Sequence, residues 1–279
     1  MALFITSLNS GSNGNCYYVG NDTEAILVDA GISCRETEKR MRLLGLSMKT
    51  VKAIFVSHEH TDHIKGITGL AQKYSLPVYT TSHTSQYCNM PVNRGLANEL
   101  APHQPISIGE LLVTAFPKQH DAIDPHSFIV TGNGITIGVF TDIGVCCEHV
   151  TTYFSRCHAA FLEANYDEEL LEKGRYPQFL KNRIRGGKGH LSNRQALEIF
   201  ISNRPPFMSH LLLSHLSADN NNPSIVKQLF DDHANGIQII IASRYEQTPI
   251  YKICEPATEA RPTKFLPITS MQPMQLSLF

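Results

Sequence analysis

The sequence predicts a layered α/β fold. Short apolar runs alternate with amphipathic stretches along most of the 279 residues, as they do in chains whose strands and helices pack in layers. Many of the apolar runs end in a histidine or a carboxylate, and sites in α/β sheets commonly collect at strand ends. A chain of this length can bury one large core or two small ones. We therefore expect sheets whose strand ends deliver side chains into one crevice.

The spacing of apolar residues predicts where the strands and helices lie. Short, mostly apolar runs predict strands at residues 3–8, 16–19, 25–28, 53–56, 77–79, 111–116, 127–130, 135–140, 159–162, 208–213 and 237–241. Amphipathic segments predict helices at 35–44, 63–74, 193–202 and 223–233. The turn Gly132-Asn133-Gly134 lies between two apolar runs and predicts a hairpin.

The composition changes near Glu255. Residues 256–273 contain four prolines, several Thr and Ser, and little periodicity, which indicates a flexible tail. We therefore expect one folded domain over residues 1–255 and a C-terminal tail over 256–279.

Charge and cysteine content limit the function classes. The formal net charge is −1, so affinity for a polyanion must come from a local basic patch. The seven cysteines form no C-x-x-C pair, which argues against a zinc ribbon and a disulfide framework. The sequence contains no signal-peptide pattern and no apolar run long enough to span a membrane, so we expect a cytoplasmic protein.

Metal-binding side chains follow the expected strands. Each lies at or shortly after the end of an apolar run, and such a repeated placement is hard to obtain by chance. These residues are Asp29, His58, His120, Asp142, Glu163 and His215.

The segment His58-Glu59-His60-Thr61-Asp62-His63 is the most concentrated of these groups. It places three imidazoles and a nearby carboxylate directly after a strand, where they can face two metal ions. Imidazole and carboxylate suit Zn²⁺, Mn²⁺ or Fe²⁺. The alternative is a solvated, histidine-rich loop.

The pattern His58-x-His60-x-Asp62-His63 resembles the H-x-H-x-D-H signature of the metallo-β-lactamase fold, over about residues 3–242. The resemblance implies a four-layer αβ/βα sandwich, and we see no inserted β-CASP domain. It also implies that Asp29 orients the histidine loop. By this resemblance one metal ion would be bound by His58, His60 and His120, a second by Asp62, His63 and His215, and both by Asp142.

Three further segments resemble the YycJ (WalJ) subgroup of this fold. They are residues 10–16 (Ser-Gly-Ser-Asn-Gly-Asn-Cys), 189–193 (Gly-His-Leu-Ser-Asn) and 214–217 (Ser-His-Leu-Ser). The resemblance implies a 5′-to-3′ exonuclease acting on DNA. Because one fold serves several chemistries, a thioester or lactone hydrolase and a non-catalytic DNA-repair accessory protein stay open as alternatives.

Three residues are candidates for the chemistry besides binding metal. Two metal ions would lower the pKa of a water molecule, and Asp62 would orient that water for attack. His190 would hydrogen-bond the scissile phosphate or protonate the leaving oxygen, held by Glu163, as in related tRNA-processing nucleases. The alternative is that His190 is a surface residue on a loop.

Two segments are candidates for holding DNA. The loop with Ser10, Ser12, Asn13 and Asn15 would cradle a 5′-phosphate, although such residues also simply build turns. A local basic stretch would follow the phosphate backbone, or it would be an ordinary exposed helix face. Its predicted DNA contacts are Arg183, Arg185 and Lys188.

The chain ends in an apolar pentapeptide at the end of the expected tail. Its residues are Gln275, Leu276, Ser277, Leu278 and Phe279. The peptide resembles the Q-L-[SD]-L-F sequence with which bacterial replication and repair proteins bind the sliding clamp of DNA polymerase. This predicts recruitment by the clamp and a role in DNA repair. The alternative is packing on this protein's own core or on a second copy.

Overall fold

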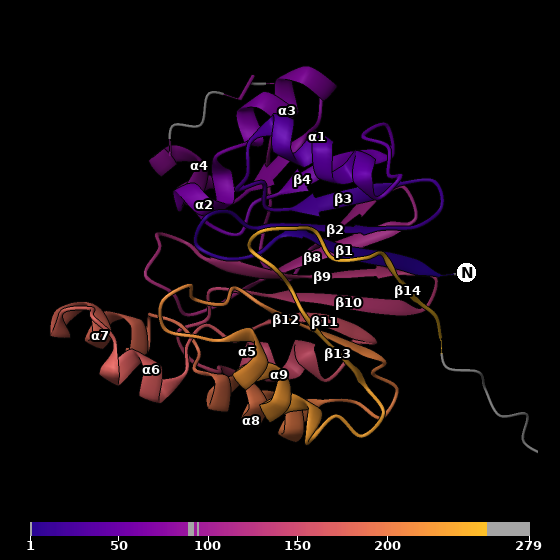
Figure 1. The fold of residues 1–279 in the computed structure, drawn as a ribbon. Helices are drawn as coiled ribbons and strands as arrows, with labels where there is room; N and C mark the ends of the chain where they lie inside the picture. The colour runs from indigo at the N-terminus through magenta and orange to yellow at the C-terminus, as the bar shows by residue number, and fades with distance from the viewer. Residues whose placement is uncertain (1, 89–91, 94, 256–279) are drawn as a thin grey trace, which may run out of the picture.

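The computed structural model describes residues 2–88, 92–93 and 95–255, and Figure 1 shows two sheets stacked face to face. In the first sheet the strands are ordered β14 (Tyr251–Ile253), β1 (Leu3–Asn9), β2 (Cys16–Gly20), β3 (Ala25–Val28), β4 (Val51–Phe55), β5 (Val78–Thr80) and β6 (Ala97–Glu99). In the second they are ordered β13 (Gln238–Ile241), β12 (His210–Ser214), β11 (Ala159–Glu163), β10 (Ile135–Phe140), β9 (His126–Gly132), β8 (Leu111–Pro117) and β7 (Pro105–Ile108).

Both sheets are mixed. From β14 to β3 the strands of the first sheet pair antiparallel, and from β3 to β6 they pair parallel. The second sheet repeats this division, with parallel pairing from β10 to β13 and antiparallel pairing from β7 to β10. Parallel strands buried on both faces read as continuous apolar runs, which is why 25–28 and 159–162 are so apolar in the sequence.

Helices cover the outer face of each sheet, which gives the four layers visible in Figure 1. The first sheet is covered by α1 (Cys34–Leu43), α2 (Thr61–Ile64), α3 (Ile67–Tyr74) and α4 (Ser82–Cys88). The second is covered by α5 (Glu148–Phe154), α8 (Asn193–Asn203) and α9 (Pro223–Asp231). Two helices, α6 (Glu168–Lys173) and α7 (Gln178–Arg185), project beyond the edge of the second sheet.

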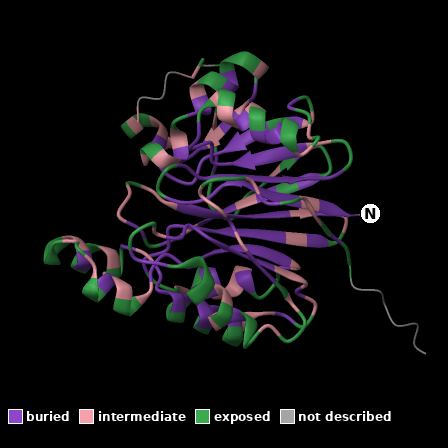
Figure 2. Cartoon of the chain, viewed as in Figure 1, coloured by how far each residue is buried: buried purple, intermediate pink, exposed green. Residues whose placement is uncertain are grey.

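The largest apolar cluster lies between the sheets, and Figure 2 shows the strands almost wholly buried. Tyr17 on β2 meets Phe161 on β11 with ring centroids 4.9 Å apart, and Phe55 on β4 meets Phe128 on β9 at 5.8 Å. Burying each such ring stabilises the fold by about 1.5–3 kcal/mol. These contacts fix one sheet on the other, so loops from both sheets keep a constant spacing at the sandwich edge.

The expected four-layer fold and the expected strands are confirmed, since every predicted strand overlaps an observed one. The predicted helix at 63–74 is wrong in one respect, because it is two helices, α2 and α3. Gly66 N donates to Ala30 O at 2.7 Å, and Asp62 O accepts from Asn15 N at 2.7 Å. Because these two backbone groups bond to other loops, they do not form the hydrogen bond that would continue the helix. Seven further elements are not apparent from the sequence pattern: β6, β7, β14, α4, α5, α6 and α7.

In the described residues no separate domain is inserted between the strands, in agreement with the expected absence of a β-CASP domain. No described helix is both long and apolar enough to cross a membrane. The tail over 256–279 lies outside the described residues, so the division at residue 255 stays a prediction.

Candidate metal centre

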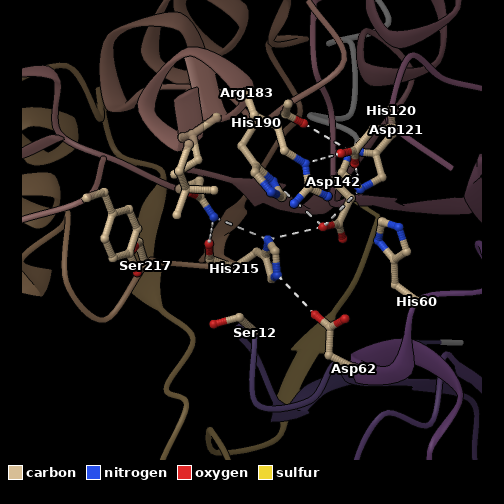
Figure 3. Close-up of a pocket in the computed structure, with 15 residues that line it drawn as sticks. Ser12, His60, Asp62, His120, Asp121, Asp142, Arg183, His190, His215 and Ser217 are labelled. Atoms are coloured by element: carbon tan, nitrogen blue, oxygen red, sulfur yellow. Dashed lines mark hydrogen bonds and ion pairs between the residues drawn. The ribbon is translucent and has the colours of Figure 1, made fainter. Parts of the chain in front are cut away.

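The strand ends of both sheets meet around one cavity of about 320 Å³, shown in Figure 3. Its walls combine imidazoles and carboxylates with residues of α7 and of two serine-containing loops. The lining includes Ser12, His60, Asp62, His120, Asp121, Asp142, Tyr176, Arg183, His190, His215 and Ser217. Residues that the sequence analysis selected from distant segments therefore lie together.

Three of these strand ends have unusual backbone geometry. Asp29, Asp142 and His215 follow β3, β10 and β12, and their φ angles are +60°, +54° and +55°. This left-handed conformation is uncommon for residues with a side chain, although Asp and His tolerate it better than most. Such strain clusters at functional sites, where the surrounding structure holds it. Here it turns each side chain out of its strand and into the site.

The histidine loop is fixed by backbone hydrogen bonds to two neighbouring loops. Asn15 N donates to Asp62 O, and Ala30 N donates to His63 O at 2.9 Å. A Cβ added at Gly31 would lie 1.6 Å from Asp62 O, so this approach requires glycine. These contacts fix the backbone of the loop that carries His58, His60, Asp62 and His63.

One candidate ligand group consists of His58, His60 and His120, which offer ring nitrogens within 4.8 Å of one another. His58 Nε2 and His60 Nδ1 are 3.1 Å apart. Burial lowers the pKa of His58 well below its usual value and that of His120 to about 4. Neutral imidazole is the form that binds metal ions.

The second candidate group consists of Asp62, His63 and His215, with Asp142 beside it. Asp142 Oδ2 lies 3.1 Å from His63 Nε2, while its Oδ1 lies 3.3 Å from His215 Nδ1 and 3.9 Å from His120 Nε2. Burial works against charging His215, but Asp142, Asp62 and Glu163 raise its pKa to about 10. Asp142 thus lies between the two groups.

The polar atoms of this cluster fit divalent cations. His120 Nε2 and His215 Nε2 are buried, and neither has a hydrogen-bond partner in the described structure. Asp142 Oδ2 is buried too, and its 3.1 Å contact with His63 Nε2 lacks hydrogen-bond geometry. His120 Nε2 lies 3.3 Å from Asp121 Oδ1, but that contact lacks hydrogen-bond geometry. Unpaired buried polar atoms cost free energy, and a bound cation would satisfy several at once.

Asp29 supports the histidine loop from behind. Its Oδ2 lies 2.7 Å from His63 Nδ1, and Ser57 donates to both of its carboxylate oxygens at 2.8 Å. Ser57 Oγ is also 2.9 Å from His58 Nδ1. These contacts leave the Nε2 atoms of both histidines free to face other candidate ligands, His60 for His58 and Asp142 for His63. The sequence analysis missed Ser57, although its position directly before His58 was a usable signal.

Glu163 connects three parts of the site. Its Oε1 lies 2.7 Å from His190 Nδ1 and 3.0 Å from His215 Nδ1, and its Oε2 accepts from Ile143 N at 2.7 Å. Although burial raises it, the neighbouring His190 and His215 lower the pKa of Glu163 to about 2. Glu163 is therefore a buried carboxylate that orients both imidazoles and the turn after Asp142.

The residues predicted to cradle a phosphate differ in what they already contact. Ser10 Oγ bonds to Tyr17 OH and accepts from His215 N, and Asn15 Oδ1 accepts from Gly11 N and Tyr17 OH. Both are buried, so their polar groups hold the loop itself. Asn13 donates to Arg244 O, and Ser12 lines the cavity. Asn15 Nδ2 also donates to Asp62 Oδ2 at 3.2 Å, so in this loop Ser12 lines the cavity and Asn15 supports a candidate ligand.

The predicted basic stretch lies on α7 and the loop after it. Arg183 lines the cavity and lies 2.5 Å from Asp121 Oδ2. Arg185 pairs with Glu172 at 3.1 Å, and Lys188 is exposed. Two of the three predicted DNA contacts are thus partly balanced by carboxylates. Asp121, which the sequence analysis missed despite its place next to His120, is one of these.

The predicted clamp-binding residues 275–279 lie outside the described residues, and their role stays a prediction.

The stacked sheets and the histidine–carboxylate cluster at their edge define the class of metal-dependent hydrolases with the metallo-β-lactamase fold. The chain belongs to this superfamily, because residues 24–215 match the family described as "Beta-lactamase superfamily domain". The resemblance stated from the sequence is thereby confirmed.

Individual relatives agree with this assignment. The chain is 33% identical over 246 residues to exodeoxyribonuclease YycJ of Bacillus anthracis, covering 85% of this chain and 92% of that protein. The metallo-β-lactamase fold protein YhfI of Bacillus subtilis superposes with a TM-score of 0.68 at 16% identity, covering 90% of this chain and all of that one. Zn²⁺-bound PqqB of Methylobacterium extorquens gives 0.69 at 12% identity, covering 88% and 99%. The two structural likenesses concern the fold.

Proposed function

We propose that the chain is a metal-dependent phosphodiesterase that degrades DNA from a 5′ end. The observation that carries the proposal is its 33% identity to a named exodeoxyribonuclease across 92% of that protein's length. The cavity supports it, because His190 and Arg183 line it beside the candidate metal ligands.

We further propose that two ions bind, one at His58, His60 and His120 and one at Asp62, His63 and His215, with Asp142 shared. Zn²⁺ and Mn²⁺ suit this donor set, and Fe²⁺ is a third candidate. When bound, the ions would lower the pKa of an attacking water and balance charge on the phosphate.

The chain's own residues would orient the attacking water and donate a proton to the leaving oxygen. Asp62 Oδ2 lies 3.6 Å from His215 Nε2 at the cavity wall, where it can accept a hydrogen bond from the attacking water and orient it. His190 uses Nδ1 for Glu163, which leaves Nε2 for the substrate. A proton at His190 Nε2 can pass to the leaving oxygen, and Ser12, Arg183 and Lys188 would hold the DNA phosphates.

A substrate comparison tests the proposal. The protein is loaded with Mn²⁺ or Zn²⁺ and offered 5′-labelled and 3′-labelled DNA, a thioester and a lactone. We expect metal-dependent release of nucleotides from the 5′ end and no comparable turnover of the acyl substrates. Hydrolysis of a thioester or lactone without digestion of DNA would support a small-molecule hydrolase. Binding of DNA without any turnover would support an accessory protein.

The variant His190→Ala is expected to lower kcat on DNA by about 10²-fold, because it removes the proton donor for the leaving oxygen. A nucleotide p-nitrophenyl ester, whose leaving group needs no proton, should lose far less. The two rates are measured with metal-loaded protein, and His233→Ala in the exposed turn after α9 serves as the control. Equal losses on both substrates would assign His190 a role other than protonation.

The tail adds a proposed partner. In Gln275-Leu276-Ser277-Leu278-Phe279, two leucines and a phenylalanine can fill an apolar cleft on the sliding clamp while the glutamine fixes the register. Tethering to a clamp raises the effective concentration of a nuclease on DNA. We propose DNA repair as the process served. The cytoplasmic location expected from the sequence stays a prediction.

Deletion of residues 275–279 is expected to abolish binding to the sliding clamp, because the anchoring side chains are lost. Digestion of short DNA should stay within about twofold of the full chain, because the affected residues follow the proposed catalytic domain. Surface plasmon resonance with immobilised clamp and a nuclease assay measure the two properties. Clamp affinity that survives the deletion would refute the docking proposal.

A further inference from the structure

The guanidinium group of Arg244 lies beside the metal cavity, and one of its nitrogens has no hydrogen-bond partner in the described structure. Arg244 follows β13, and its Nη1 is a buried atom without a hydrogen-bond partner in the described structure. Its Nη2 is 3.5 Å from Ser12 Oγ, at the limit of a hydrogen bond. Arg244 also forms no ion pair with any described residue, in contrast to Arg183 and Arg185. Its positive charge therefore has no described carboxylate within ion-pair distance.

The surrounding backbone holds Arg244 in place. Ser10 N donates to Ser243 O at 3.1 Å, and Asn13 Nδ2 donates to Arg244 O at 2.9 Å, so the loop over 10–15 is bound to the segment after β13. A Cβ added at Gly11 would lie 3.3 Å from Arg244 Cβ, which shows how closely the two segments approach. These contacts fix the backbone that carries the Arg244 side chain.

Arg244 lies next to the metal cavity and outside it. A second cavity, of about 270 Å³, has Arg244 and Ser217 in its wall together with apolar residues such as Leu216, Pro223 and Ile241. Ser217 lines both cavities, and Ser12 lines the metal cavity while contacting Arg244. Figure 3 shows Ser12 in the wall of the metal cavity, which it shares with Asp62 and His215. A strand bound at the metals would reach Arg244 past these two hydroxyls.

We infer that Arg244 and Ser12 form a subsite for the terminal 5′-phosphate of the DNA strand. The inference rests on the proposed function and identifies which end of the substrate the enzyme recognises. A terminal phosphate carries more charge than an internal diester and offers three free oxygens, and the planar guanidinium fork matches it well. The Ser12 hydroxyl can donate to the same group. Binding the 5′-phosphate at Arg244 and Ser12 would place a phosphodiester bond near the 5′ end of the strand at the metal centre.

The test compares Arg244→Gln with the wild type on oligonucleotides that carry a 5′-phosphate, a 5′-hydroxyl or a 3′-phosphate. Losing a charge-assisted contact is expected to lower kcat/KM for the 5′-phosphorylated strand by about 30-fold. The 5′-hydroxyl strand should change by less than about threefold, because its end offers nothing for Arg244 to bind. Arg42→Gln on the exposed face of α1 is the matched control.

A binding arm separates this inference from the proposed function. Fluorescence anisotropy of the same oligonucleotides is measured with metal-free protein, and the 5′-phosphate is expected to strengthen binding to the wild type but not to Arg244→Gln. Thermal unfolding checks that the variant is folded. Arg244→Lys keeps the charge but not the planar guanidinium, so its gain in affinity from the 5′-phosphate should lie between those of the wild type and Arg244→Gln.

Equal losses on the 5′-phosphate and 5′-hydroxyl strands would overturn the subsite, and so would a wild type indifferent to the 5′ end or one that prefers a 3′-phosphate. A wild type that digests no DNA yet binds the 5′-phosphate through Arg244 would refute the proposed function alone.

Discussion

Replacing Asp142 with asparagine is expected to reduce DNA hydrolysis by at least about 10³-fold. The carboxylate lies between the two candidate ligand groups, and its Oδ2 is buried without a hydrogen-bond partner in the described structure. An amide carries no charge and binds hard cations poorly. Metal ions contribute several kcal/mol to such reactions, and each 1.4 kcal/mol changes the rate about tenfold.

The fold should survive this change, because asparagine tolerates the φ of +54° found at position 142. Metal content by mass spectrometry, single-turnover digestion and thermal unfolding are measured together. Asp124→Asn, on the loop that precedes β9, is the control for losing a carboxylate near the site. A fully metal-loaded Asp142→Asn protein with normal turnover would disprove the shared role of Asp142.

The variant Gly31→Ala is expected to destabilise the protein by about 4 kcal/mol or more, which is in the exceptional range for a single substitution. The added Cβ would lie 1.6 Å from Asp62 O and 2.6 Å from Asn15 N. Both contacts are to backbone, so neither can be relieved by a side-chain rotation. The three loops that meet there would have to separate.

Urea unfolding and metal affinity of Gly31→Ala are compared with those of Gly95→Ala, a position with open space around it. Because Asp62 and His63 are carried by the displaced loop, we expect metal affinity to fall together with stability. An unfolding midpoint and metal content equal to those of the wild type would show that the loops accommodate the methyl group.

The sequence predicted the interior of the fold well. Strands such as β3 and β11 are buried along their whole length, so their apolar runs are unbroken and end abruptly at a polar residue. This change from an apolar run to a polar residue identified Asp29 and Glu163 as candidates for the site. The grouping of residues as distant as His58 and His215 came from family resemblance, since periodicity does not reveal which loops meet.

Elements at the periphery could not be predicted in this way. The strand β6 has the sequence Ala-Asn-Glu and is partly exposed, and it exists because β5 supplies a pairing edge. The helices α6 and α7 project from the sandwich, so they bury too few apolar side chains to give a clear period. Arg244 escaped notice for a related reason, because an isolated arginine carries no local signal until Ser12 is seen beside it.

The left-handed turns at Asp29, Asp142 and His215 also bear on how this protein can evolve. In our proposal each of these residues bends the backbone and also supplies a side chain to the metal site. Asparagine or glycine can adopt the same backbone conformation without supplying that side chain. A duplicated copy with one such exchange is expected to lose hydrolysis and keep its fold, which is a short route to a protein that only binds.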